Sequence, residues 1–421
     1  MNNNSNDLVR FITAGSVDDG KSTLIGRLLF DSKSILADQL SLLSSAKNSR
    51  QNSAGIDFAF LTDGLESERE QGITIDVAYR YFSTKNKKFI IADCPGHEQY
   101  TRNMVTGAST ADSVIFLVDA SQVTDGNLLT QTKRHTAISC LLNIPNFILA
   151  VNKMDLVNFD EKIYKQIVLS FTKLLHTFDT KKEFSAVPIS ALHGDNVVKS
   201  SSNMPWYKES TLLSYIENNR YARQTNTNLR LPIQLVMRWD GEKKADQRAY
   251  SGKLDSGQIS VNEKIKMWPT NQNVKITKLT YLGKEVTKVF ANQCVTFWLD
   301  KDVDVARGDV AVSPEDFPSL NKEFNANIAW LDSKDLNTSR KYILRQATRE
   351  TQVKIKVVNK LNLSSLIREN SDTLSMNEIG LTFIKSAKPI LVDKYMDFPK
   401  TGSFILIDDS THQTCAAGMI C

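Results

Sequence analysis

The sequence has 421 residues, which is too long for a single hydrophobic core, so we expect two or three domains. Its 41% hydrophobic and 24% charged residues are typical of a soluble globular protein, without the ~20 consecutive apolar residues of a membrane span, and its net charge of +5 neither requires nor excludes a nucleic-acid partner. The five cysteines are scattered without C-x-x-C spacing, which indicates neither a zinc site nor a disulfide framework.

The first predicted elements are a strand, a glycine-rich loop and a helix. Residues 8–14 form a short apolar run typical of a buried parallel strand, and apolar residues recur at helical spacing over residues 22–29. Between them, residues 15–22 read GSVDDGKS and match the phosphate-loop pattern G-x-x-x-x-G-K-[ST]. Such a loop surrounds a phosphate with backbone N–H groups at the positive end of a helix dipole. An ordinary βα turn is the alternative. We expect Lys21 to reach the β- and γ-phosphates and the Ser22 hydroxyl to bind Mg²⁺.

A long polar segment follows, over residues 31–88. Its charged run, residues 66–70, is by default a solvated helix face. Thr74 lies two residues after Gly72, and a hydroxyl beside a flexible glycine could close on a γ-phosphate and its metal ion.

Four further apolar runs each end in a polar residue. They cover residues 89–93, 114–119, 147–152 and 186–190. An open parallel sheet binds its ligand at the carboxyl ends of its strands. We therefore expect a mostly parallel sheet with flanking helices, and a ligand site at one edge of that sheet.

One of these polar strand ends has the residues of a γ-phosphate-binding element. Residues 93–96, DCPG, fit the D-x-x-G element of GTPases, in which Asp93 would hold Mg²⁺ through a water and the Gly96 N–H would touch the γ-phosphate. His97 follows directly and could orient the attacking water, a surface histidine being the alternative. We interpret Cys94 as a small packing residue rather than a redox switch.

Two later strand ends point to guanine. Residues 152–155, NKMD, fit N-K-x-D, in which the Asp155 carboxylate accepts hydrogen bonds from N1–H and the 2-amino group of the base. Ser190 and Ala191 would supply a backbone N–H to the guanine O6. N-K-x-D is weak alone. Four elements in the right order, each at a strand end, predict a GTP site.

The pattern of apolar and polar residues changes near residue 224. Residues 224–228 are polar and unpatterned, as in a linker, and short apolar runs between turn residues follow, which indicates β structure. A second shift lies near residues 318–321, after which apolar and polar residues alternate from Phe324 to Trp330. We predict a phosphate-loop GTPase domain over residues 1–223 and β-barrels over 224–320 and 321–421.

The combination resembles the translational GTPase family, in which a G domain precedes two β-barrels, as in elongation factor Tu. Several stretches are more similar to one branch, the GTPase subunits (subunit 1) of bacterial sulfate adenylyltransferases. Elongation factors typically have His at the positions of Ser16 and Asp19, and Arg at the position of Gln71. The stretches that carry the likeness to this branch are residues 15–23, 63–82, 95–104, 107–112, 377–380 and 401–408, whereas residues 307–309 are shared across the wider family.

The resemblance is incomplete at three places. Cys94 replaces a usual Thr, Ala249 stands where a Gly is common, and residues 396–400 lack an expected Asn-Arg pair. The last two departures affect details of the barrels and not the nucleotide site.

The resemblance implies a role for each matching residue. Gly20, Lys21 and Thr23 would hold phosphates. Lys21, Thr74 and His97 would form the catalytic set. The metal donors would be Ser22, Thr74 and Asp93. The full nucleotide set would be Gly15, Ser16, Val17, Asp18, Asp19, Gly20, Lys21, Ser22, Thr23, Asp93, Cys94, Pro95, Gly96, His97, Asn152, Lys153, Met154, Asp155, Ser190, Ala191 and Leu192.

The resemblance also implies a function. GTP hydrolysis would drive the uphill formation of adenosine 5′-phosphosulfate and pyrophosphate from ATP and sulfate, on a separate catalytic subunit that forms a heterodimer with this chain. The start of the chain lacks a signal-peptide pattern, so we expect a cytoplasmic protein. An elongation-factor-like GTPase that delivers aminoacyl-tRNA is the alternative, disfavoured by Asp19 and Gln71. A nucleotide-binding scaffold without turnover is a second alternative, disfavoured by Thr74 and His97.

Overall fold

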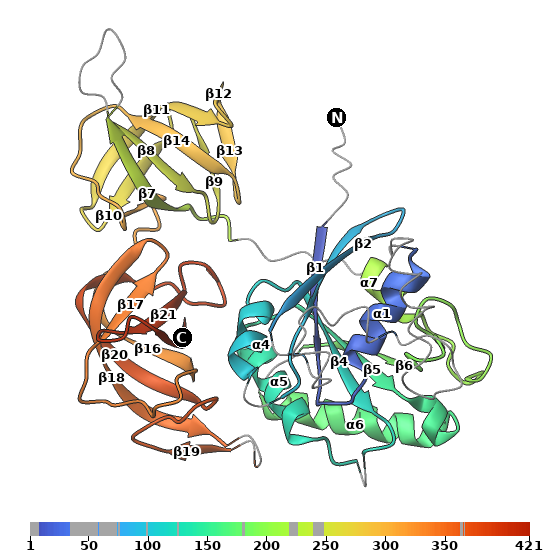
Figure 1. The fold of residues 1–421 in the computed structure, drawn as a ribbon. Coiled ribbons are helices and arrows are strands. Elements are labelled where there is room, and N and C mark those ends of the chain that lie inside the picture. Colours follow the sequence, from blue (N-terminus) through green and yellow to red (C-terminus); the bar gives the residue numbers. More distant parts are fainter. Residues whose placement is uncertain are drawn as a thin grey trace. The chain divides into compact units, whose positions relative to one another are not determined.

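The computed structural model describes residues 8–33, 58, 74, 76–97, 100–123, 126–178, 182–218, 226–238, 248–362, 365 and 367–421. The chain divides into two compact units with a boundary between residues 223 and 224 (Figure 1). The domain limits at residues 224 and 321 stay predictions. The predictions made for residues 63–73, among them Gln71 and Gly72, lie outside the described residues.

The first unit is built on a six-stranded sheet in the order β2-β3-β1-β4-β5-β6. Its neighbouring strands are parallel except β2 and β3, which are antiparallel. The predicted, mostly parallel sheet is confirmed. The strands are β1 (Leu8–Ala14), β2 (Ala78–Ser83), β3 (Lys88–Asp93), β4 (Ser113–Asp119), β5 (Asn146–Asn152) and β6 (Phe184–Pro188).

Helices cover both faces of this sheet (Figure 1). Helix α1 buries Leu24, Ile25 and Leu28, and these side chains share a core with Ile216 of α7. On the other face, Phe171 of α6 contacts Phe116 of β4 with ring centroids 5.2 Å apart. Among the described helices, none combines the length and apolar character needed to cross a membrane. The helices are α1 (Lys21–Asp31), α4 (Thr101–Ala108), α5 (Thr130–Leu141), the 3₁₀ helix η3 (Met154–Val157), α6 (Glu161–Thr177) and α7 (Leu212–Asn218).

The strand register gathers the polar strand ends at one edge of the sheet. Thr13 of β1 is the register partner of Asp93, and Asp119 of β4 is the partner of Asn152. β1 lies between β3 and β4, where successive connections leave in opposite directions, and such a switch point opens a crevice at the carboxyl ends. β6 ends at Pro188, two residues earlier than the predicted run.

The second unit contains the two predicted barrels. In the first, six strands close because β10 pairs with β11, and in the second, six strands close because β17 pairs with β18. The strands of the first are β7 (Arg230–Arg238), β8 (Arg248–Lys253), β10 (Lys264–Trp268), β11 (Gln272–Tyr281), β14 (Cys294–Leu299) and β15 (Val310–Val312), with the short β9 (Gln258–Ser260), β12 (Lys284–Val286) and β13 (Lys288–Phe290). Those of the second are β16 (Leu320–Trp330), β17 (Tyr342–Gln346), β18 (Arg349–Leu361), β20 (Ile379–Leu391), β21 (Ser403–Asp408) and β22 (Thr414–Ile420), with the short β19 (Arg368–Asn370).

A buried arginine joins the two barrels. Arg230, at the start of β7, has a side chain only 2% exposed. Its guanidinium donates two hydrogen bonds to Asp393 at 2.8 and 2.9 Å and pairs with Asp316 at 2.9 Å. The ring of Phe398 lies 4.2 Å from the guanidinium carbon. A buried charge is tolerated when its partners are this complete, so the barrels are connected by an interaction that is costly to break.

Candidate nucleotide-binding site

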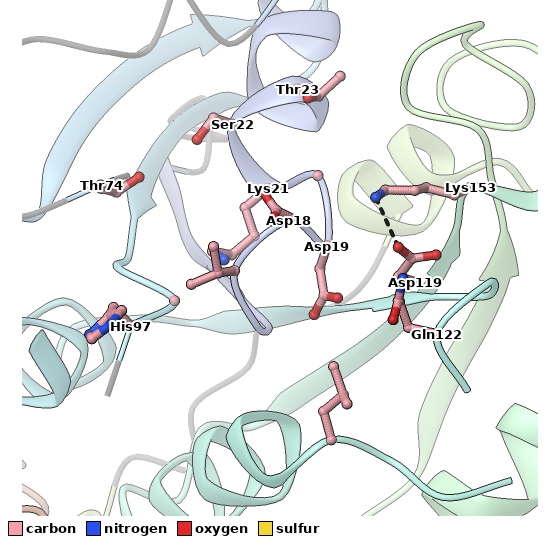
Figure 2. A pocket seen from close by; sticks show the side chains of 14 residues that line it. Asp18, Asp19, Lys21, Ser22, Thr23, Thr74, His97, Asp119, Gln122 and Lys153 are labelled. Atoms are coloured by element: carbon pink, nitrogen blue, oxygen red, sulfur yellow. Dashed lines mark ion pairs between the residues drawn. The ribbon is translucent and has the colours of Figure 1, made fainter. Parts of the chain in front are cut away.

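A cavity of about 640 Å³ opens at the carboxyl edge of the first unit's sheet (Figure 2). Its wall combines loops that follow β1, β3, β4 and β5. The sequence predicted most of its lining and missed Asp119, Gln122 and Leu129. The lining residues are Val17, Asp18, Asp19, Gly20, Lys21, Ser22, Thr23, Thr74, Gly96, His97, Asp119, Gln122, Leu129 and Lys153.

The phosphate loop leads directly into helix α1. Gly20 caps the helix in the left-handed region, with φ of 86°, and a Cβ atom there would lie 2.4 Å from Asn152 Nδ2. Only glycine meets both constraints without strain. No side chain of the described residues caps α1, so its first N–H groups remain available to an anion.

Lys21 is buried at the base of the loop. Its ammonium group donates to the carbonyl of Ser16 at 2.6 Å and to that of Gly15 at 3.3 Å. Burial lowers the pKa of Lys21, while Asp19 and Asp93 act in the opposite direction. The group therefore lies beside the cavity with carbonyl partners, which a phosphate would outcompete as an anionic acceptor.

Asp19 is buried beside Lys21. Burial raises the pKa of Asp19 to about 6, although Lys21 opposes the shift. One of its carboxylate oxygens accepts the Ser16 N–H at 2.5 Å, and its backbone carbonyl accepts from the Asn152 side chain at 2.8 Å. These bonds fix the middle of the phosphate loop.

The oxygen donors predicted for Mg²⁺ lie together. The Ser22 hydroxyl donates to one Asp93 oxygen at 3.3 Å, and Thr13 donates to the other at 3.1 Å. Thr74 lies on the same side of the cavity as Ser22 (Figure 2). Hydroxyl and carboxylate oxygens are the hard ligands that Mg²⁺ prefers, so this donor set fits the ion.

The N-K-x-D segment connects the phosphate loop to the loop after β6. Asn152 is buried, and besides its bond to Asp19 its side-chain oxygen accepts the Ala191 N–H at 2.9 Å. Lys153 pairs with Asp119 at 2.8 Å and lines the cavity (Figure 2). Asp155 lies 3.9 Å from the imidazole of His193. The remaining predicted residues lie outside the cavity wall: Gly15, Ser16, Asp93, Cys94, Pro95, Asn152, Met154, Asp155, Ser190, Ala191 and Leu192.

The two residues of uncertain role after β3 differ in their surroundings. His97 lines the cavity, and its ring centroid is 5.9 Å from that of Tyr100. Cys94 is fully buried, and burial raises the pKa of its thiol. A Cβ atom on Gly107 would lie 2.9 Å from the sulfur, so Cys94 is a packing residue against α4.

Helix α5 contributes contacts that sequence reasoning missed. Gln131 donates to the Gly96 carbonyl at 2.9 Å, and His135 accepts the Gly15 N–H at 3.1 Å. Their spacing of four residues places both side chains on one face of the helix. No local motif in the sequence links that face to the two loops that it contacts.

Comparison with known proteins agrees with this architecture. The family model for the elongation factor Tu GTP binding domain matches residues 6–225, and that for the GTP-eEF1A C-terminal domain-like family matches residues 323–421. Sulfate adenylyltransferase subunit 1 of Alteromonas mediterranea is 42% identical over 98% of this chain and 87% of its own length. The chain belongs to the sulfate adenylyltransferase subunit 1 family. The corresponding protein of Bacteroides fragilis is 43% identical over 98% of this chain and 86% of its own length.

Other similar proteins differ more in length or sequence. The bifunctional enzyme NodQ of Rhizobium meliloti is 43% identical over 98% of this chain, which spans 64% of the length of NodQ. A solved structure of sup35 complexed with GMPPNP matches 100% of this chain and 95% of its own at 22% identity, with a TM-score of 0.43, too low to add to the assignment.

Proposed function

We propose that this chain is the GTP-hydrolysing regulatory subunit of a sulfate adenylyltransferase. It couples GTP hydrolysis to formation of adenosine 5′-phosphosulfate and pyrophosphate from ATP and sulfate on a separate catalytic subunit. The observation that carries the proposal is the identity of 42% over 98% of the chain with a protein named as subunit 1 of that enzyme. The phosphosulfate anhydride is high in energy, so coupling to a second nucleotide gives the reaction its driving force.

The loop after β1 binds the phosphates of GTP in this proposal. In this proposal Lys21 turns from its carbonyl partners to the β- and γ-phosphates, and the N–H groups of the loop and of Thr23 hold the remaining oxygens. Ser22, Thr74 and Asp93 are the residues that would hold Mg²⁺. The ion, when bound, neutralises phosphate charge.

The residues after β3 carry out the hydrolysis step in this proposal. The Gly96 N–H contacts the γ-phosphate, and His97 orients the water that attacks it. Support comes from the position of both residues on the cavity wall. The His97→Ala variant should bind GTP and lose its hydrolysis, whereas His176→Ala, a change at an exposed histidine of α6, should keep both GTP binding and hydrolysis.

The loops after β5 and β6 bind the guanine base in this proposal. Asp155 accepts from N1–H and the 2-amino group, a pairing that adenine does not offer. Ser190, Ala191 and Leu192 form the loop that would supply an N–H to O6, and Lys153 covers the base. In this structure the Ala191 N–H is bonded to Asn152 and the Ser190 N–H to the Asp195 carbonyl, so either group would have to change partner to bind O6. Asn152 holds these loops to the phosphate loop, which is supported by its two hydrogen bonds.

The partner in this proposal is the catalytic subunit, with which the chain forms a heterodimer. The location is the cytoplasm, since the reaction consumes GTP and ATP. Nucleic acid has no part in the function.

GTP turnover by the purified chain tests the proposal. It is measured for the chain alone, with the catalytic subunit, and with that subunit plus ATP and sulfate. Stimulation that requires both the partner and its substrates is the expected result. Stimulation by ribosomes in place of that mixture would assign the chain to translation and overturn the proposal.

A further inference from the structure

Helix α5 holds two loops of the candidate site at once. The Gln131 amide donates to the Gly96 carbonyl at 2.9 Å, and His135 Nδ1 accepts the Gly15 N–H at 3.1 Å. Residues four apart lie on the same face of a helix. One face of α5 therefore bonds both the start of the phosphate loop and the loop that follows β3.

Each of these bonds has a defined direction. The Gln131 oxygen accepts from Arg134, which turns the amide nitrogen toward the Gly96 carbonyl. Burial, with smaller contributions from Lys21 and Arg134, lowers the pKa of His135 to about 3, so the ring is neutral and Nδ1 is an acceptor. The proton is then on Nε2, which is buried without a hydrogen-bond partner among the described residues. An apolar side chain would avoid this unpaired donor, so the bond to Gly15 is what requires a histidine.

Gly96, which α5 holds through its carbonyl, packs closely against the phosphate loop. A Cβ atom on Gly96 would lie 2.4 Å from Lys21 Nζ and 2.9 Å from the carbonyl carbon of Ser16. The backbone of Gly96 is therefore in close contact with the loop. Its carbonyl belongs to the peptide that joins it to His97, so the Gln131 bond fixes the orientation of that peptide.

We propose that Gln131 and His135 are positioning residues that hold the Gly96–His97 peptide and the start of the phosphate loop in the geometry that hydrolyses GTP. The inference rests on the proposed function, because it concerns the same site. Gln131 acts through Gly96 and His97, which face the γ-phosphate. His135 acts through Gly15, at the start of the loop that holds the phosphates of both GTP and GDP.

The test for Gln131 uses the full chain and the isosteric Gln131→Glu variant. Glutamate keeps an acceptor toward Arg134 and loses the donor toward Gly96. Affinities for fluorescent GTP and GDP and the single-turnover hydrolysis rate are measured. We expect the GTP-to-GDP affinity ratio to fall about three- to tenfold, the value of one hydrogen bond, and the hydrolysis rate to fall with it. Gln166→Glu, at an exposed position of α6, is the matched control and leaves both unchanged.

The test for His135 compares two substitutions. His135→Asn keeps an acceptor near the position of Nδ1, whereas His135→Leu removes it. We expect the Leu variant to lose affinity for GTP and GDP by similar factors and the Asn variant to retain it. A wild-type affinity ratio and hydrolysis rate in Gln131→Glu would overturn this inference and leave the proposed function standing. Equal nucleotide affinities in the two His135 variants would do the same. Failure of the wild-type chain to bind GTP would overturn the proposed function as well.

Discussion

Asn152 offers a direct test of how the two halves of the site are joined. Its side chain donates to the Asp19 carbonyl at 2.8 Å and accepts the Ala191 N–H at 2.9 Å. Asn152, Asp19 and Ala191 are all buried. In Asn152→Ala both partners lose their hydrogen bond at positions that bulk water does not reach.

The size of the effect follows from those two partners. An unsatisfied buried group costs about 1–3 kcal/mol, so the loss is about 2–4 kcal/mol of unfolding free energy when partial relaxation is allowed for. For a domain of this size, 1 kcal/mol corresponds to about 2–4 °C in Tm. We therefore expect the Tm of the first unit to fall by about 5–15 °C in Asn152→Ala. Asn152→Asp loses only the donor and keeps the acceptor for Ala191. Its Tm should therefore fall by about half as much.

Differential scanning calorimetry without nucleotide measures both variants, and a fluorescence titration with GTP follows. The reasoning also predicts weaker GTP binding, since the phosphate loop loses its tie to the loop after β6. A Tm within about 1 °C of the wild-type value for Asn152→Ala would show that the two bonds contribute nothing, and the argument would fail.

Three further predictions concern backbone, interface and pH. Gly20→Ala places a side chain in left-handed backbone, which costs about 1–2 kcal/mol, and displaces the Asn152 amide, so calorimetry should show a lower Tm and titration weaker GTP binding. Arg230→Met leaves the Asp393 carboxylate buried without its cation, and urea unfolding should show a loss of about 3–5 kcal/mol that the exposed Arg238→Met control does not share. The pKa of His135 falls from 6.5 to about 3 on folding, so its contribution to stability is present above pH 6.5 and is lost as the pH falls toward 3. At pH 5 this loss is about 2 kcal/mol. Between pH 7 and pH 5, the unfolding free energy measured in urea should therefore fall by about 2 kcal/mol less in His135→Asn than in the wild-type chain.

The sequence was sufficient for those parts of the site that are local in the chain. The phosphate loop and the polar residue at each strand end are set by short motifs and by the period of buried strands, so the sheet and most of the cavity wall could be predicted. Lys21 and Ser22 were found in this way, because the motif itself contains them.

The rest depends on pairs that are distant in sequence. Gly15 and His135 are 120 residues apart, and Gln131 meets Gly96 across 35 residues. Neither pair leaves a local pattern, because only the crossover that places α5 beside β4 brings them together. The sequence placed Asn152 in the nucleotide set but gave no indication of its amide contacts to Asp19 and Ala191. A single sequence carries no information on these contacts.

Arg230 is one of several side chains that couple the two barrels when a force reaches the second unit along the chain. It is the first residue of β7, a few residues after the predicted linker, and its guanidinium is bound to Asp393 of the second barrel and to Asp316. Arg349 of the second barrel also pairs with Asp309 of the first at 3.3 Å, and Lys400 pairs with Asp255 at 3.4 Å. Turning the first barrel against the second would therefore break several ion pairs, one of them buried, so the two barrels respond to a torque together.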